Sequence, residues 1–222
     1  MYFKGLPDHA KPDFDLQSHF SLFKKSNVIF NALSSYSVCD HHVGCLSFKT
    51  VLDGEEWYGI GNRQVAVRPG KFLMMNNNQA YSSRIDTTED VRSLSIFFKE
   101  EFASSVFQDL LFQEEFLIDN PSMIKLINPE FIQTLTNINH ELQIKLTVLI
   151  STLNSNGYIN SIVDEHLMFI LRDLIVIQLS GTDHINRIKA VKPYTRIEIY
   201  KRLCVAKDLI DPVIWNNRTW KY

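Results

Sequence analysis

The sequence predicts an α+β protein in which an antiparallel β-barrel or sandwich comes first and helices follow. Two observations predict this class. Short strand-like segments separated by Gly, Pro and Asn turns fill residues 28–98, and apolar residues recur at helical spacing from about residue 100. The chain has 222 residues, of which 45% are hydrophobic, so it is long enough to bury a substantial core and its composition is not that of a disordered protein.

Turn residues divide the first hundred positions into strands. Asp53-Gly54 ends an alternating apolar segment, Gly61-Asn62 is typical of a two-residue hairpin, and Pro69-Gly70 favours a type II turn. Short strands at this regular spacing are typical of antiparallel barrels and sandwiches. The predicted strands are 28–33, 46–52, 56–60, 63–67, 72–75, 79–85 and 91–98.

Helix signals follow the strands. Apolar residues begin to recur every fourth position near Glu100, which predicts a first helix there. Asn128-Pro129 favours the start of a second helix, because Asn can cap a helix and Pro fits its first position. Asn156-Gly157 favours the end of that helix.

A third helix, predicted over 161–179, carries apolar residues on two sides, which is more than one barrel surface can cover. One side alternates steps of four and three, the spacing of a helix-pairing seam. We therefore expect this side to form a homodimer interface, with an ordinary core helix of a monomer as the alternative. The expected interface residues are Val163, Leu167, Ile170, Leu174 and Ile177.

The segment Ser180–Asp183 is turn-like and marks a boundary. Beyond it, the capping box Thr195–Glu198 predicts a last helix, which Asp211-Pro212 is expected to end. We accordingly divide the chain into residues 1–99 (barrel and N-terminal arm), 100–182 (helical dimerisation region) and 183–222 (linker and last helix). A single helix with its flanks is too small to form a core of its own.

The net charge of -2 predicts no chain-wide attraction to nucleic acid. Between Asp183 and Asp208, however, seven Lys and Arg residues outnumber three acidic ones, which fits either a solvated helix face or the edge of a nucleic-acid-binding module. Three cysteines without metal spacing, together with the lack of a membrane-length apolar run or a secretory signal, predict a cytoplasmic protein without membrane association.

Motifs for nucleophilic catalysis and for phosphate binding are missing from the sequence. A barrel metal site is conceivable at His41-His42, but adjacent strand residues point to opposite faces and the next histidine is His140. We therefore expect no catalytic residue, no metal and no cofactor. The polar and aromatic residues of the barrel are candidates to line a small-molecule pocket. They are Lys49, Trp57, Tyr58, Arg63, Gln79, Tyr81 and Arg84.

Three stretches resemble one family. Residues 51–58 (VLDGEEWY) and 67–76 (VRPGKFLMMN) resemble the N-terminal cupin-like sensor domain of AraC-type transcriptional regulators, and residues 191–203 (VKPYTRIEIYKRL) resemble that family's lead-in to its DNA-binding domain. The resemblance implies a double-stranded β-helix barrel that binds an effector, a helical pair that dimerises, and two helix-turn-helix units that read DNA. The sequence after Asp211 does not resemble those units, so we expect specific DNA binding only of a full-length form.

The leading hypothesis is thus the effector-binding and dimerisation portion of an AraC-like regulator, which carries the first helix of an incomplete DNA-binding domain and is not an enzyme. Its partners would be a second copy of the chain and a small-molecule effector of unknown class. The alternative is a metal-dependent cupin enzyme, either an isomerase or a dioxygenase. A stand-alone sugar-binding or structural barrel is a third hypothesis, but it leaves the basic segment before Asp208 unexplained.

Overall fold

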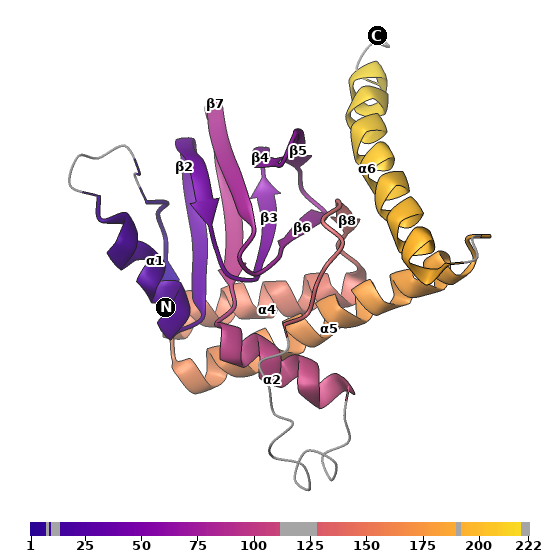
Figure 1. The fold of residues 1–222 in the computed structure, drawn as a ribbon. Helices are drawn as coiled ribbons and strands as arrows, with labels where there is room; N and C mark the ends of the chain where they lie inside the picture. The colour runs from indigo at the N-terminus through magenta and orange to yellow at the C-terminus, as the bar shows by residue number, and fades with distance from the viewer. Residues whose placement is uncertain (8, 10–13, 112–127, 190–191, 219–222) are drawn as a thin grey trace, which may run out of the picture.

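The computed structural model describes residues 1–7, 9, 14–111, 128–189 and 192–218. A curved antiparallel sheet forms the first part of the chain and helices follow, as the sequence predicts (Figure 1). The elements are β1 (Tyr2–Phe3), α1 (Leu16–Lys25), β2 (Val28–Val43), β3 (Ser47–Asp53), β4 (Glu56–Ile60), β5 (Arg63–Val67), β6 (Lys71–Met75), β7 (Ala80–Phe97), α2 (Glu100–Leu111), β8 (Thr136–Asn137), α4 (His140–Asn156), α5 (Asn160–Asn186) and α6 (Pro193–Arg218).

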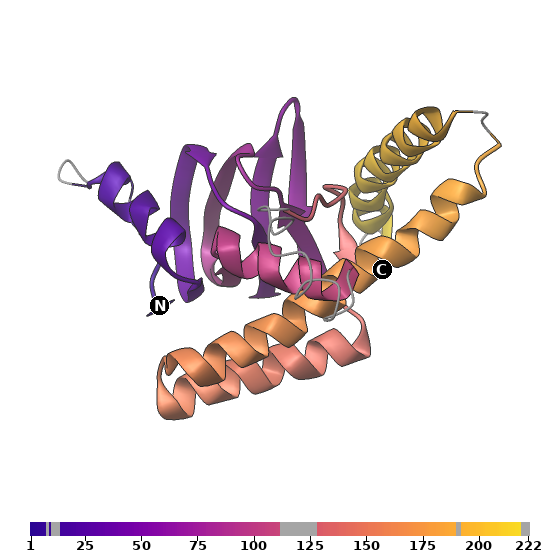
Figure 2. The same cartoon turned by 60° about the horizontal axis from the view of Figure 1, so that its bottom comes forward.

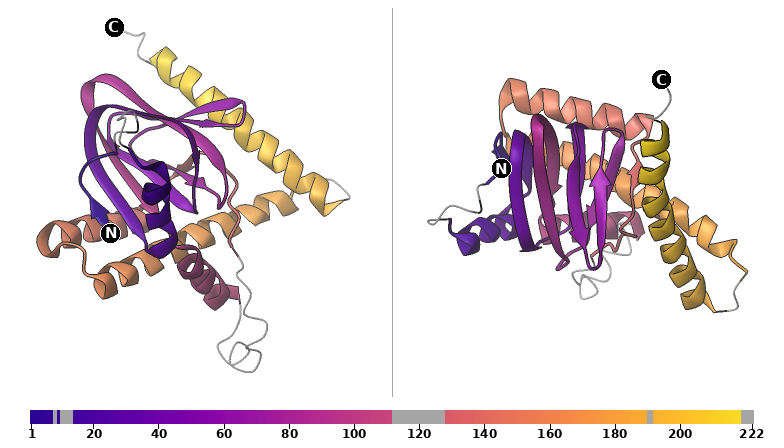
Figure 3. Two further views of the ribbon diagram at one scale, coloured as in Figure 1. Left: turned by 60° about the vertical axis from the view of Figure 1, so that its left-hand side comes forward. Right: turned by 90° about the horizontal axis from the view of Figure 1, so that it is seen from above.

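One long strand, β7, organises the sheet. It pairs with β2 along almost its whole length, while its other edge pairs first with β4 and then with β3. The sheet curves around an interior, which the left view of Figure 3 shows in the curvature of the strands. The two strands predicted at 79–85 and 91–98 are thus one strand, β7, which pairs with β2 on both sides of an irregularity between Asp86 and Val91.

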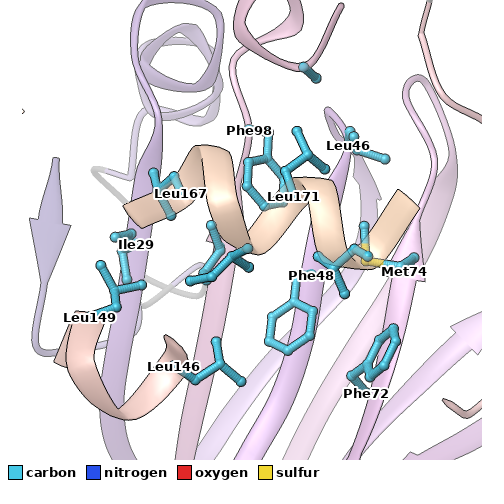
Figure 4. Close-up of a cluster of buried hydrophobic side chains, with 14 of the residues drawn as sticks. Ile29, Leu46, Phe48, Phe72, Met74, Phe98, Leu146, Leu149, Leu167 and Leu171 are labelled. Carbon is cyan, nitrogen blue, oxygen red and sulfur yellow. The ribbon is translucent and has the colours of Figure 1, made fainter. Parts of the chain in front are cut away.

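Strand alternation gives each face of the sheet its own role. In β3, Phe48 points toward the helices, whereas its neighbour Lys49 points into the barrel. Figure 4 shows Phe48, Phe72 and Met74 facing the leucines of α4 and α5 in the main hydrophobic core. This core attaches the two helices to the outer face of the barrel, where they lie side by side (Figure 2).

The helix start predicted at Asn128-Pro129 is wrong. Residues 128–135 are not helical, because they make tertiary contacts with the sheet and with α2: Asn128 donates to Glu100 Oε1 at 2.7 Å, and the Phe131 N–H donates to Asn76 Oδ1 at 2.8 Å. Helix α4 begins at His140 instead, where Asn139 Oδ1 accepts from the Leu142 N–H at 2.8 Å. Its predicted end is confirmed at Gly157, whose φ is 69°.

The turn predicted at Ser180–Asp183 is also wrong, since α5 continues to Asn186. The Ser180 hydroxyl donates to the Ile177 carbonyl at 2.7 Å, a local bond that is compatible with a helix. Helix α6 likewise begins at Pro193, before the predicted capping box, and passes through Asp211-Pro212. A proline suits the first helical position and, inside a helix, removes one backbone hydrogen bond without always ending it.

Within the described part of the chain, none of the helices is both long and apolar enough to cross a membrane.

Candidate functional site

A cavity of about 50 Å³ lies inside the barrel and is closed on one side by α1. We call it the barrel cavity. Side chains from four strands, β2, β3, β4 and β7, converge on it, and Phe23 of α1 stacks on Phe97 with ring centroids 4.4 Å apart. The polar and aromatic residues that determine the chemistry of the cavity are His42, Lys49, Glu56, Tyr58, Tyr81 and Phe97.

Lys49 is the central polar group of the barrel cavity. Its side chain is directed inward by the alternation of β3, and the residue is only 3% exposed. Its Nζ lies 3.6 Å from the centroid of the Phe97 ring and 5.4 Å from that of Tyr81. Among the described residues, no oxygen accepts a hydrogen bond from Nζ. Burial lowers the pKa of Lys49 to about 7, and the nearby Glu56 opposes that shift only in part.

Glu56 is the second buried ionisable group. The Ser93 hydroxyl donates to its Oε2 at 2.7 Å, and the Tyr58 hydroxyl also interacts with the carboxyl group. Burial raises the pKa of Glu56, while the bond from Ser93 and the charge of Lys49 work in the opposite direction. Glu56 and Lys49 both belong to the described residues, and no direct ion pair joins them. Ser93 holds the carboxyl group of Glu56, and this carboxyl group does not hold the ammonium group of Lys49.

His42 closes the aromatic wall of the cavity. Its ring contacts Phe20 edge-on, with centroids 4.3 Å apart, and lies 4.8 Å from the ring of Tyr81. Its Nε2 is buried and, among the described residues, has no hydrogen-bond partner. Burial, followed by the charge of Lys49, lowers the pKa of His42 to about 3, so the imidazole is neutral near pH 7. A Cβ on Gly44 would lie 2.6 Å from Nε2, which makes glycine necessary for this ring position.

The structure brings three of the seven predicted ligand-binding residues together, namely Lys49, Tyr58 and Tyr81. Trp57 and Arg84 face each other across β4 and β7 on the outer surface, beside a separate shallow depression. Arg63 lies at the junction with α6, and Gln79 precedes β7 and donates to the carbonyl of Ala80.

Sequence reasoning did not assign His42, Glu56 or Phe97 to this cavity. It did place His41 and His42 on opposite faces of a strand, and the structure confirms this, since His41 is exposed and His42 is 5% exposed. The available signal was Lys49 itself, a charged residue in the middle of the apolar segment 46–52. A charge within an otherwise buried strand is a reason to search for a site.

The residues of the predicted dimer seam lie within the chain. Val163, Leu167 and Ile170 are fully buried, Leu174 is 1% exposed, and all four belong to the core between α5, α4 and the sheet. Ile177 packs at the edge of the same core. The four buried side chains do not reach the surface where a second copy would meet them. Helices α4 and α2 both contact α5, so most of the apolar surface of α5 is covered within the chain.

No group of three or more His, Cys, Asp or Glu side chains is placed to hold a metal ion anywhere in the described ranges. His19, Cys39, His42 and Glu56 all line the barrel cavity, but no three of them are placed to hold one ion, and Lys49 adds an ammonium group, which cannot ligate a cation while it is protonated. The donor set of the cavity is consequently better matched to an anion than to a metal.

By sequence, neither a family model nor a curated protein matches the chain. Among solved structures, ToxT from Vibrio cholerae, bound to (E)-4-(8-methylnaphthalen-1-yl)but-3-enoic acid, is similar with a TM-score of 0.47 and 13% identity over 70% of this chain and 57% of ToxT. The AraC-like transcriptional activator CuxR is similar with a TM-score of 0.36 and 15% identity over 72% of this chain and 56% of CuxR.

The chain thus spans a little more than half the length of either protein. The predicted α+β class, with an antiparallel sheet ahead of helices, is confirmed. The similarity to ToxT and CuxR extends over about 70% of this chain.

Proposed function

We propose that this chain is the effector-binding portion of a dimeric regulator of the AraC type, and that its effector is a small organic acid whose acid group meets Lys49 in the barrel cavity. The observation that carries the proposal is the Lys49 ammonium group, which is buried in a cavity and has no hydrogen-bond acceptor among the described residues. Buried charges in proteins are normally paired, so an unpaired one inside a cavity indicates a missing anionic partner.

The surroundings of Lys49 favour an acid over a neutral ligand. A carboxylate beside Nζ would supply the charge partner that Lys49 lacks among the described residues. It would also accept a charge-assisted hydrogen bond from Nζ. The unpartnered Nε2 of His42 can donate a second bond if that nitrogen carries the proton. The aromatic walls formed by Phe97, Tyr81 and Tyr58 suit the apolar body of such an acid.

The cavity also limits the size of the ligand. A volume of about 50 Å³ accommodates an acid group with a few carbon atoms, since a cavity needs on the order of 10–15 Å³ by this measure to hold one water molecule. A larger acid would have to displace Phe23 and its neighbours on α1, which close the cavity on that side.

The regulatory part of the proposal rests on the sequence resemblance and on the helices after the barrel. Exposed Lys and Arg residues between 187 and 207 lie on α6 and in the segment before it. This part of the chain includes the sequence that resembles the family's lead-in to its DNA-binding domain. DNA recognition itself would belong to a longer form of the protein. A regulator of this kind would act in the cytoplasm and would need neither cofactor nor catalytic residue.

For the homodimer, the surface of the α4–α5 pair that points away from the barrel is the best candidate. Exposed apolar side chains lie on both helices, and Lys145 of α4 pairs with Asp173 of α5 at 2.6 Å. The exposed apolar residues are Ile144, Val148, Ile162, Phe169 and Val176, with exposures between 37% and 53%. We call them the outer α4–α5 stripe and infer that a second copy covers it.

Isothermal titration with acids and their amides tests the effector class. We expect one or more of butyrate, hexanoate and benzoate to bind the intact chain, at least tenfold more tightly than the matching primary amide. The Lys49→Met variant, which keeps the shape of the side chain, should lose this preference for the acid. Equal affinity for acid and amide, or an unchanged preference in Lys49→Met, would contradict the proposal.

A further inference from the structure

We propose that Asp208 is a latch that holds α6 against the barrel, and that Leu135 couples this latch to the barrel cavity. The second half of the proposal rests on the function proposed above, because it treats the cavity as the effector site. The first half is a property of the fold alone.

Asp208 is a carboxylate of α6 that is buried against the barrel, with its side chain 3% exposed. The Thr134 hydroxyl donates to its Oδ1 at 2.8 Å, and the Leu135 N–H donates to the two carboxylate oxygens at 3.2 and 3.1 Å. Arg63 of β5 lies on the other side, with Nη1 3.4 Å from Oδ2. Each of these partners belongs to the barrel region, so the carboxylate ties α6 to two separate segments of it.

A second bond reinforces the first. Lys207, the neighbour of Asp208 on α6, donates from Nζ to the Leu135 carbonyl at 2.9 Å. Both backbone groups of Leu135 are therefore bonded to α6. Arg63 in turn donates to the carbonyl of Gln133, so the segment 133–135 is fixed between β5 and α6.

The contact is polar rather than apolar, and this makes it reversible. Among the side chains of α6 that the structure describes, Cys204 and Asp208 are buried, whereas Leu203, Leu209 and Ile210 are more than half exposed. Figure 1 shows α6 standing beside the barrel rather than across it. With so little apolar surface buried, the docked position of α6 depends on the hydrogen bonds of Asp208, and their loss would leave little to hold the helix.

Leu135 connects this latch with the cavity. Its side chain, 4% exposed, belongs to the cluster inside the barrel that contains Tyr58 and Tyr81. The same two tyrosines line the cavity beside Lys49. A ligand that displaces either ring would press on Leu135, whose N–H and C=O hold α6. We therefore expect occupancy of the cavity to loosen α6, and the exposed basic residues of α6 would change position with it.

Labelling of the 222-residue chain with iodoacetamide without ligand, followed by digestion and mass spectrometry of the separate cysteine peptides, tests the latch. Cys204 is 9% exposed and lies on the docked side of α6, while Cys39 is buried in the barrel and reports opening of the barrel itself. Asp208→Ala and Thr134→Val should raise the labelling rate of Cys204 at least tenfold and fivefold, respectively, and leave that of Cys39 within twofold. The matched control is Glu198→Ala, which removes a carboxylate that pairs within α6 with Arg202 and should change neither rate.

Leu135→Ala tests the coupling in the same assay, because it shortens the side chain between the tyrosines and the latch but keeps the backbone hydrogen bonds. We expect a rise in Cys204 labelling of at least threefold, against no rise for Met75→Ala, a truncation in the same cluster but outside segment 133–135. Unchanged Cys204 labelling in Asp208→Ala, or a parallel rise for Cys39, would overturn the latch. Equal effects of the Leu135 and Met75 variants would overturn the coupling. None of these measurements uses an acid, so a failure of the effector proposal would leave them intact.

Discussion

The Lys49 ammonium nitrogen lies 3.6 Å from the centroid of the Phe97 ring, in a cavity that contains an acidic side chain but no ion pair with it among the described residues. A cation over an aromatic face gains some electrostatic stabilisation, yet this contact does not replace the water that burial removes. Burial therefore lowers the pKa of Lys49 to about 7. This relationship makes both the stability of the fold and the affinity for an acid depend on pH.

The first prediction is that Lys49 makes the protein more stable as pH rises above 7. The folded chain loses the Lys49 proton near pH 7, whereas the unfolded chain keeps it until about pH 10.4. The unfolded state thus binds more protons in this window, so the free energy of unfolding increases with pH, by at most about 1.4 kcal/mol per unit for one group. Urea titrations between pH 7.5 and 9.5 measure this slope, which Lys49→Met should reduce and the exposed Lys24→Met should not. Identical slopes in both variants would contradict the burial of a charged lysine.

The second prediction concerns acid. His42 has a pKa of about 3 in the fold, chiefly because it is buried, compared with about 6.5 in an unfolded chain. Between these values the unfolded state binds the extra proton, so stability falls as pH falls from 6.5 toward 3. His42→Phe, which keeps an aromatic ring against Phe20, should reduce this loss in urea titrations at pH 4.5, 5.5 and 6.5. His41→Phe, at an exposed position next in sequence, is the control and should retain it.

The strands and their turns could be predicted because local chemistry determines them. Gly54, Gly61 and Gly70 all have positive φ in the structure, at the turns where glycine is expected. The helix start predicted at Asn128-Pro129 was wrong because tertiary contacts, and not local chemistry, determine the structure there. The same residue types serve in irregular segments, and here the bond from Asn128 to Glu100 and the pairing of β8 with β6 outweigh the helical preference.

Part of the site was also accessible from sequence. Lys49, Tyr58 and Tyr81 could be proposed as ligand residues because polar and aromatic groups on a barrel are the usual lining of a pocket. Alternation alone cannot say which half of such residues points inward, and Trp57 and Arg84 proved to be on the outside. The residue spacing of α5 correctly indicates a continuous apolar face. The spacing does not show what packs against that face. In the structure it packs against the barrel of the same chain, because tertiary packing decides this.

The third prediction is that Gly54 is required for the β3–β4 turn. Its φ is +79°, and a Cβ would lie 2.8 Å from Cγ2 of Val91. Gly54→Ala therefore adds a steric clash to backbone strain and should lower the free energy of unfolding by about 1–3 kcal/mol. Gly61→Ala provides the comparison, since Gly61 also has a positive φ but has open space around it. Urea unfolding should show the smaller loss in Gly61→Ala, and the reverse order would contradict the contact with Val91.

The fourth prediction concerns self-association through the outer α4–α5 stripe. Phe169 and Val176 lie two turns apart on the exposed side of α5, with exposures of 42% and 53%, whereas Leu167 lies in the core. A lysine at either exposed position would place an unpaired charge in the proposed interface but would remain solvated in a monomer. Phe169→Lys and Val176→Lys should thus shift a dimer to monomer in sedimentation velocity runs while leaving urea unfolding of the monomer within about 0.5 kcal/mol of wild type. Gln143→Lys, exposed on α4 outside the stripe, should remain dimeric. A wild-type chain that sediments as a monomer at high concentration, or stripe variants that still dimerise, would remove this surface from the interface.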